Sequence, residues 1–151
     1  SYTYDGDSRR VSSIRQSDGT QLSLESVQSG AEYKVSVLRD ALGQTYRFSY
    51  DTSARTTQVT DPAGQVSAYA YDAKGQLLSI ASPGPGGARL LQRFEYNGNG
   101  DLVRTTDADG RSVFMAYDAR GNQVLQRDAA GNTVTRTFNA QNQLLTETVY
   151  T

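Results

Sequence analysis

Residues 107–131 read DADGRSVFMAYDARGNQVLQRDAAG, and this stretch shows how the chain is organised. Asp107-Ala-Asp-Gly110 is followed ten residues on by Tyr117-Asp118-Ala-Arg-Gly121, and Asp128-Ala-Ala-Gly131 begins eleven residues after Tyr117. Two kinds of glycine-containing turn therefore alternate, with short strand-like runs between them. Because a fixed period of this length is the signature of a repeat architecture, the period of 21 residues takes precedence over every local motif.

The same spacings recur along the chain, with ten residues from an Asp to the next aromatic residue and eleven from there to the next Asp. The positions that we assign to this structural repeat are Tyr50, Asp51, Asp61, Gly64, Tyr71, Asp72, Gly75, Tyr96, Asp107, Gly110, Tyr117, Asp118, Gly121, Asp128, Gly131 and Phe138. Asp or Asn at the start of a turn can accept hydrogen bonds from backbone N–H groups two residues on, and Gly at the fourth place accepts a positive φ. Asp-x-x-Gly is therefore predicted to be a turn for a physical reason.

The residues between the turns have the period of β-strands. Tyr46, Phe48 and Tyr50 alternate with polar residues, which is typical of a strand with one buried face. The second strand of each repeat carries adjacent apolar residues, as in Leu102-Val103 and Leu144-Leu145. We therefore expect an all-β fold, a curved antiparallel meander of about a dozen short strands with two strands per repeat. The recurring aromatic rings are expected to hold successive hairpins in register.

The composition excludes several functions. The chain has 15 Lys and Arg against 16 Asp and Glu, and the basic residues are scattered, so nothing indicates binding to nucleic acid. There is no Cys and no His, which excludes disulfides, Cys-containing zinc sites and nucleophiles or bases of those types. No apolar run approaches the roughly 20 residues of a membrane span, and no signal peptide is present. Because the Asp residues fall at turn starts set by the period, we expect no enzyme activity, no metal and no cofactor.

Two regions depart from the period. In residues 1–32 the expected Tyr-Asp pair is replaced by Val27-Gln-Ser-Gly30, so this repeat is degenerate, whereas residues 33–151 repeat regularly. A Pro/Gly loop at 83–87 lengthens one connection, and we interpret it as a tolerated length variation at the sheet margin. We predict one repeat array over residues 1–151. Both ends present strands without a capping unit, which indicates a piece of a longer array and predicts edge-to-edge self-association.

Several correctly spaced turns resemble those of the RHS family, also called YD repeats. The resemblance rests on turns such as Tyr71-Asp72-Ala-Lys-Gly75 and Tyr117-Asp118-Ala-Arg-Gly121, with Asp61-Pro-Ala-Gly64 in a linking position. It covers residues 33–149 well and residues 4–32 loosely. The resemblance implies a β-sheet ribbon that spirals into a hollow shell, as in bacterial Rhs polymorphic toxins, toxin-complex C components and teneurins.

The same resemblance implies a function. The chain would be a structural module of a shell that encapsulates or presents a toxin or effector domain, with no catalysis of its own. Its partners would be the rest of its repeat array and an enclosed C-terminal toxin domain, and its location would be outside the cell or at the bacterial cell surface. The family's aspartyl self-cleavage region is not matched, because Asp61-Pro62 lies among ordinary turns, and we interpret Asp61 as a turn residue.

Two other binding functions stay open. Rings on one strand face could bind carbohydrate as a cell-surface adhesion module; these are Tyr46, Phe48, Tyr50, Tyr69, Tyr71 and Tyr117. Repeated weak sites would gain affinity through multivalency, but the same rings are expected to pack as the core. Asn97-Gly-Asn99-Gly-Asp101 has oxygen ligands at the spacing of a calcium loop, whereas Ala108 stands where an EF-hand needs Glu. The plain interpretation of that segment is a Gly-rich turn.

Overall fold

The computed structural model describes all 151 residues and contains fourteen β-strands and no helix. The strands are β1 (Tyr2–Tyr4), β2 (Val11–Arg15), β3 (Gln21–Ser29), β4 (Glu32–Arg39), β5 (Thr45–Asp51), β6 (Thr56–Thr60), β7 (Val66–Tyr71), β8 (Leu77–Ser82), β9 (Arg89–Tyr96), β10 (Leu102–Asp107), β11 (Ser112–Tyr117), β12 (Gln123–Arg127), β13 (Thr133–Phe138) and β14 (Leu144–Tyr150). The predicted all-β, antiparallel fold is confirmed. The chain forms two units, Ser1–Ala70 and Tyr71–Thr151. No helix is present that could reach across a bilayer.

In the first unit, strands β1 to β7 follow one another in chain order, and each pairs antiparallel with the next. Regular strands form around residues 27–30, where the sequence has no Tyr-Asp pair. Strands β3 and β4 run for nine and eight residues, and Gly30, with a φ of 64°, lies in the two-residue turn that joins Ser29 to Glu32. In this region the loss of the turn motif lengthens the hairpin and does not remove it.

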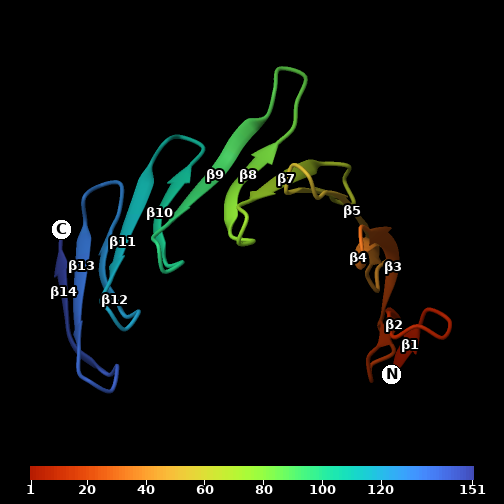
Figure 1. Cartoon of the computed structure of the whole chain (residues 1–151), viewed down its shortest axis with the longest axis horizontal. Coiled ribbons are helices and arrows are strands. Elements are labelled where there is room, and N and C mark those ends of the chain that lie inside the picture. The colour runs from red at the N-terminus through yellow and green to blue at the C-terminus, as the bar shows by residue number, and fades with distance from the viewer. The chain divides into compact units, whose positions relative to one another are not determined.

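In the second unit, strands β8 to β14 also follow chain order, with turns at alternate rims of the sheet (Figure 1). The Pro/Gly loop connects β8 to β9, and Figure 1 shows that hairpin, in green, extending beyond the turns that follow it. The loop is closed by a hydrogen bond of 3.0 Å from Gly87 N to Gly84 O. The insertion therefore changes one connection, while the strands on either side keep their antiparallel pairing.

Strand register gives the second unit two different faces. One face, here called the apolar face, carries Phe94, Val113, Met115 and Val134. The opposite face, here called the polar face, carries Glu95, Arg104, Thr106, Ser112, Phe114 and Arg127. The alternation follows from the two-residue period of strands, because a side chain and its cross-strand partner stand on the same face.

Burial is shallow throughout the chain. Only Val37 and Ser112 are buried, each with 8% of its surface exposed. The rings of Tyr50, Tyr71 and Tyr117 are half-buried rather than enclosed. The reason is architectural: within each unit a single layer of strands can bury side chains only against neighbours on the same face. The core predicted from the aromatic rows is therefore a thin layer along the sheet, and the rings are neither fully covered nor exposed in a row.

Candidate functional site

The most regular feature of the chain is the turn that begins with Asp or Asn. In the turn after β11, Asp118 N donates to Asn122 O at 2.9 Å, and Gly121 N donates to Asp118 O at 3.1 Å. Oδ1 of Asp118 accepts from the backbone N–H groups of Arg120 and Asn122, at 2.9 and 3.0 Å. Gly121 has a φ of 83°, a region in which other L-residues are strained. The backbone N–H groups of Asp118, Arg120, Gly121 and Asn122 therefore all have acceptors within the turn.

This hydrogen-bonding pattern repeats along both units. The paired backbone hydrogen bonds recur in the turns that begin at Asp40, Asp61, Asp72, Asn97, Asp107, Asp118, Asp128 and Asn139. Each of these side chains accepts at least one backbone N–H bond of 2.8 to 3.0 Å. Asn can replace Asp because the accepting atom is Oδ1 in both. The assigned Asp positions from Asp61 to Asp128 therefore lie at turn starts.

In two turns the residue with a positive φ is not a glycine. Asp51 is the last residue of β5, and a four-residue loop follows it, with Arg55 at a φ of 51° in place of a glycine. Its Oδ1 accepts from the backbone N–H of Ala54 at 2.9 Å and from the hydroxyl of Ser53. In the turn of Asn139, Asn142 has a φ of 61° where the other turns have Gly. Asn tolerates this conformation better than most residues.

Four carboxylates at turns have a lowered pKa, those of Asp18, Asp51, Asp118 and Asp128. Asn122 Nδ2 donates to Oδ2 of Asp118 at 2.9 Å, and together with the backbone N–H bonds to Oδ1 this lowers the pKa of Asp118. The pKa of Asp128 is lowered in the same way, first by the side chain of Asn132 at 2.7 Å and then by backbone N–H groups. Hydrogen bonds to the charged form favour it. Both groups are therefore suited to remain ionised acceptors within their turns.

The tyrosine that precedes a turn makes a second recurring contact. Its hydroxyl donates to a backbone carbonyl of the preceding repeat: Tyr50 to Val35 O at 2.6 Å and Tyr117 to Leu102 O at 2.9 Å. Tyr96 donates likewise to Leu77 O at 3.0 Å, across the hairpin that carries the Pro/Gly loop. We call this contact the tyrosine–carbonyl bond. It ties the end of the first strand of one repeat to the second strand of the repeat before it.

A β-bulge explains why these carbonyls can accept. The pairing of β9 with β10 shifts between Leu102 and Arg104, so that Val103 is the extra residue directly after the acceptor Leu102. In β4 the extra residue is Ser36, directly after the acceptor Val35. A bulge disrupts the ladder locally and leaves backbone groups without their usual partners. The tyrosine hydroxyl supplies such a partner.

Neighbouring turns at one rim of the second unit also contact each other. Arg120 Nη1 donates to Asn139 O at 2.9 Å, and Asn122 Nδ2 donates to Asn142 Oδ1 at 3.0 Å. Gln76 Nε2 makes a weaker bond of 3.3 Å to Gly100 O. Each of these bonds joins a Tyr-Asp or Tyr-Asn turn to the next turn at the same rim. The rim is therefore linked by side chains as well as by the strands.

The sequence predicted the turns but not the tyrosine–carbonyl bond. A signal for it was present, because Tyr recurs at positions 50, 71, 96 and 117 where a phenyl ring would pack equally well, and only Phe138 lacks a hydroxyl. A recurring phenol indicates a polar contact for its hydroxyl. The bulges also had a signal in the adjacent apolar pairs, such as Leu102-Val103, which break the two-residue alternation of a strand.

In the possible calcium loop, residues 97–101, side-chain oxygens accept hydrogen bonds from within the segment. Oδ1 of Asn97 accepts from the backbone N–H groups of Asn99 and Asp101, at 3.0 and 2.9 Å. Nδ2 of Asn97 donates to Oδ2 of Asp101 at 2.9 Å. No group of three or more His, Cys, Asp or Glu side chains comes together anywhere in the chain. The turn has the same hydrogen bonds as its neighbours, with an added side-chain bond that resembles the one between Asn122 and Asp118.

These contacts define a class of protein, an antiparallel repeat ribbon built from two-strand units with Asp-x-x-Gly turns and linked by tyrosine hydroxyls. The family model of the RHS Repeat matches residues 55–88 and 96–133. Over these residues the chain is an array of RHS repeats, and the predicted family is confirmed. No curated protein matches the chain in sequence.

Two solved structures resemble the fold. One is the crystal structure of TcdB2-TccC3-Cdc42, with 15% sequence identity and a TM-score of 0.50, over 89% of this chain and 9% of that chain. The other is the Tc holotoxin pore of Photorhabdus luminescens, which contains a TccC3 variant, with 14% identity and a TM-score of 0.48, over 99% of this chain and 10% of that chain. The chain thus spans no more than a tenth of either protein. The first likeness supports the all-β repeat fold.

Proposed function

We propose that the chain is a structural module of an RHS shell that encloses or presents a toxin or effector polypeptide. The observation that carries this proposal is the tyrosine–carbonyl bond, which at Tyr50, Tyr96 and Tyr117 couples a repeat to the repeat before it. A wall built in this way can be extended repeat by repeat, since each new hairpin needs only the edge and the carbonyl of its predecessor. The seven residues of β14 are all exposed, which leaves such an edge available for a further strand.

The proposal includes the absence of catalysis in these repeats. Asp107, Asp118 and Asp128 could serve as acids or bases only if their oxygens faced a substrate. Their Oδ1 atoms instead accept backbone N–H groups of their own turns, at 2.9 to 3.0 Å. Such bonds hold the carboxylates in a structural role, and the spacing of the three residues is that of the repeat.

The comparisons support a place in a larger assembly. Residues 55–88 and 96–133 match the RHS Repeat, and the crystal structure with the similar fold contains TccC3 together with TcdB2 and Cdc42. By this proposal the partners of the chain are further repeats of its own array and an enclosed C-terminal toxin domain, and the assembly acts outside the cell that makes it.

The coding sequence on both sides of residues 1–151 tests this proposal. Many further Tyr-Asp repeats followed by a distinct C-terminal domain are expected, because a shell needs more repeats than this chain contains. An open reading frame confined to these residues would contradict enclosure.

The exposed edge of β14 also predicts self-association of the isolated 151-residue chain. Unpaired N–H and C=O groups along a strand form a template for another strand. Light scattering over a wide concentration range should show dimers or longer assemblies. A monomer at every concentration would contradict this part of the proposal.

Carbohydrate binding remains the second candidate function. The observation that favours it is the partial exposure of the aromatic rows, since the half-buried rings of Tyr46 and Tyr69 keep some surface in contact with solvent. A glycan array incubated with the labelled chain tests it. Specific retention that is lost in Tyr46→Ser would support an adhesion module, and a blank array would leave the shell as the proposed function.

A further inference from the structure

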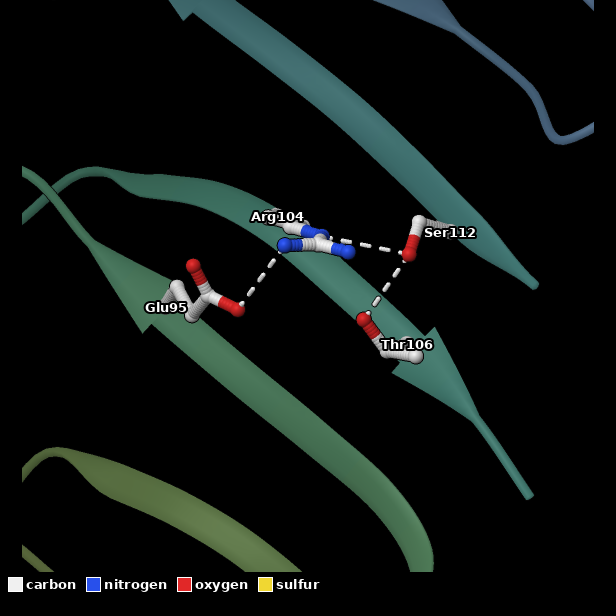
Figure 2. Close-up of polar contacts among 4 residues, drawn as sticks. All are labelled: Glu95, Arg104, Thr106 and Ser112. Atoms are coloured by element: carbon white, nitrogen blue, oxygen red, sulfur yellow. Dashed lines mark hydrogen bonds and ion pairs between the residues drawn. The ribbon is translucent and has the colours of Figure 1, made fainter. Parts of the chain in front are cut away.

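The polar face of the second unit contains a fixed guanidinium beside an exposed aromatic ring. Figure 2 shows Arg104 lying between Glu95 and Ser112, with Thr106 bonded to the same serine. Arg104 Nε donates to Ser112 Oγ at 3.1 Å, and Ser112 Oγ is 2.9 Å from Thr106 Oγ1. Ser112 is one of the two buried residues of the chain. These bonds hold Arg104 with its guanidinium carbon 5.1 Å from the centre of the Phe114 ring.

Phe114 and Arg127 belong to a cavity next to this cluster. The cavity has a volume of about 540 Å³ and lies between the turns that begin at Asp107 and Asp128. Ser112 and Phe114 line it from β11, and Arg111 and Arg127 line it from the two sides. Phe114 is 44% exposed and pairs across the strands with Arg104 on one side and Arg127 on the other. The cavity volume lies within the range of ordinary ligand sites, about 300 to 1,000 Å³.

The charged residues that line this cavity, Arg111, Arg127 and Asp128, differ in whether they have partners. Arg127 makes no ion pair and no hydrogen bond through its side chain. The nearest acid in sequence, Asp128, is occupied by its own turn through Ala130 and Asn132. Arg111 differs, because it pairs with Asp109 at 3.1 Å. All the N–H groups of the Arg127 guanidinium can therefore donate hydrogen bonds to an incoming carboxylate.

The arginine on the apolar face, Arg136, differs from Arg127 because its side chain has partners within the sheet. Arg136 is paired with Glu147 at 2.7 Å and donates to Gln123 at 2.9 Å. Arg136 is thus satisfied within the sheet, whereas Arg127 on the polar face is not. In a chain with a net charge of -1, an unpaired arginine beside an exposed ring marks a place where an external anion is attracted.

We propose that this cavity binds an acidic, aromatic segment of a polypeptide. Arg127 takes a carboxylate through its forked N–H groups, which match carboxylate geometry, and Phe114 packs against the neighbouring aromatic side chain of the ligand. Arg104 already covers part of the Phe114 ring, so the ligand ring meets it edge to face, an arrangement that aromatic pairs favour. A sugar would need an open ring face to stack on, which makes a polypeptide the better fit. This inference rests on the proposed function, because it assigns the polar face to the enclosed or presented polypeptide.

The test uses the 151-residue chain and a dye-labelled peptide in which two glutamates flank a phenylalanine. Fluorescence anisotropy should show binding that is lost near 1 M salt, where the screening length falls to about 3 Å. The matched peptide with glutamines should bind at least fivefold more weakly. Arg127→Gln should weaken binding of the acidic peptide about tenfold, and Phe114→Leu should weaken it by a smaller factor.

Arg47→Gln provides the matched control. Arg47 is an exposed arginine of β5 in the first unit, and its substitution changes the net charge by the same amount. It should leave the affinity unchanged, and circular dichroism should show that all variants keep the strand content of the wild type. Equal affinity of wild type and Arg127→Gln would overturn the proposal. Binding of polygalacturonate in place of the peptide, with the same dependence on Arg127, would overturn it in favour of an acidic glycan.

A failure of the proposed peptide site can be distinguished from a failure of the proposed shell function. If the complete protein shields its C-terminal domain from protease while the peptide fails to bind, the polar-face site is wrong and enclosure stands. If the peptide binds through Arg127 while the domain is cleaved freely, the site is correct and enclosure is wrong.

Discussion

The hairpin β3–β4 and the hairpin β11–β12 keep their two strands paired in register by different means. The first uses strands of nine and eight residues, a two-residue turn with Gly30, and no Tyr-Asp motif. The second uses strands of six and five residues, a complete Asp118 turn and the tyrosine–carbonyl bond of Tyr117. Long strands gain stability from additional ladder pairs, whereas short strands gain it from the turn and from the neighbouring repeat. The motif therefore allows each repeat to be short without losing its register.

The largest effect should come from removing an aromatic ring that joins two repeats. Tyr117→Ala removes a half-buried ring and its bond to Leu102, and should lower the free energy of unfolding by about 2 to 3 kcal/mol. Tyr150→Ala is the matched control, because Tyr150 is 57% exposed and should cost about 0.5 kcal/mol or less. Denaturant melts compare the two. Equal losses would mean that the ring of Tyr117 has no special role in coupling repeats.

The next effect concerns the glycine of the turn. Gly121→Ala places a side chain at a φ of 83° with no atom within 4 Å, so the cost is backbone strain of about 1 to 2 kcal/mol. Gly98→Ala tests the same change at a position without positive φ and with equally open surroundings. It should be neutral or slightly stabilising, because alanine reduces the freedom of the unfolded chain. Similar losses at both positions in thermal melts would contradict the turn account.

A smaller effect on stability is expected when only the hydroxyl of Tyr117 is removed. Tyr117→Phe keeps the ring and removes the tyrosine–carbonyl bond, at a cost of about 1 kcal/mol. The reverse change, Phe138→Tyr, adds a hydroxyl at the equivalent position of the next repeat, where β12 has a bulge at Val124. It should stabilise the chain by about 0.5 to 1 kcal/mol in denaturant melts. Destabilisation by Phe138→Tyr would show that the bond depends on features other than the repeat geometry.

The smallest effect is the dependence on pH. The folded pKa of Asp118 lies below its ordinary value because Asn122 and backbone N–H groups donate to the carboxylate. Its contribution to stability is therefore complete above about pH 3.9 and is lost as the pH falls through the lower folded pKa. Asp118→Asn keeps an Oδ1 acceptor and should reduce the loss of stability measured between about pH 5 and pH 2. An unchanged pH profile would contradict the assignment.

The elements that could be predicted from sequence are those fixed by local chemistry. Asp107, Gly110 and their equivalents indicate turns, because one hydrogen-bonding side chain and one residue with a positive φ determine the backbone conformation there. The rings of Tyr117 and Phe138 indicated register because they recur with the turns. The strand pattern followed from the same spacing, and it also indicated the antiparallel order.

Other features depend on contacts between repeats, and the sequence indicates them only indirectly. The bulge at Val103 is an extra residue relative to the partner strand, so its effect appears only when β9 and β10 are paired. The shallow burial of the rings follows from a single layer of strands, which periodicity cannot distinguish from a sheet with a covered face. The cavity beside Phe114 needs two turns that are adjacent only in the folded sheet.

The most direct test of the proposed enclosure is protease protection in a protein that carries these repeats together with the C-terminal domain that the proposal expects. The intact protein is treated with a nonspecific protease, and the fragments of its C-terminal domain are followed by mass spectrometry. The account predicts that this domain survives while the shell is folded and is digested once the shell is opened, for which Tyr117→Ala and its equivalents provide destabilised variants. A C-terminal domain that is digested at the same rate in the folded protein and in those variants would contradict the account.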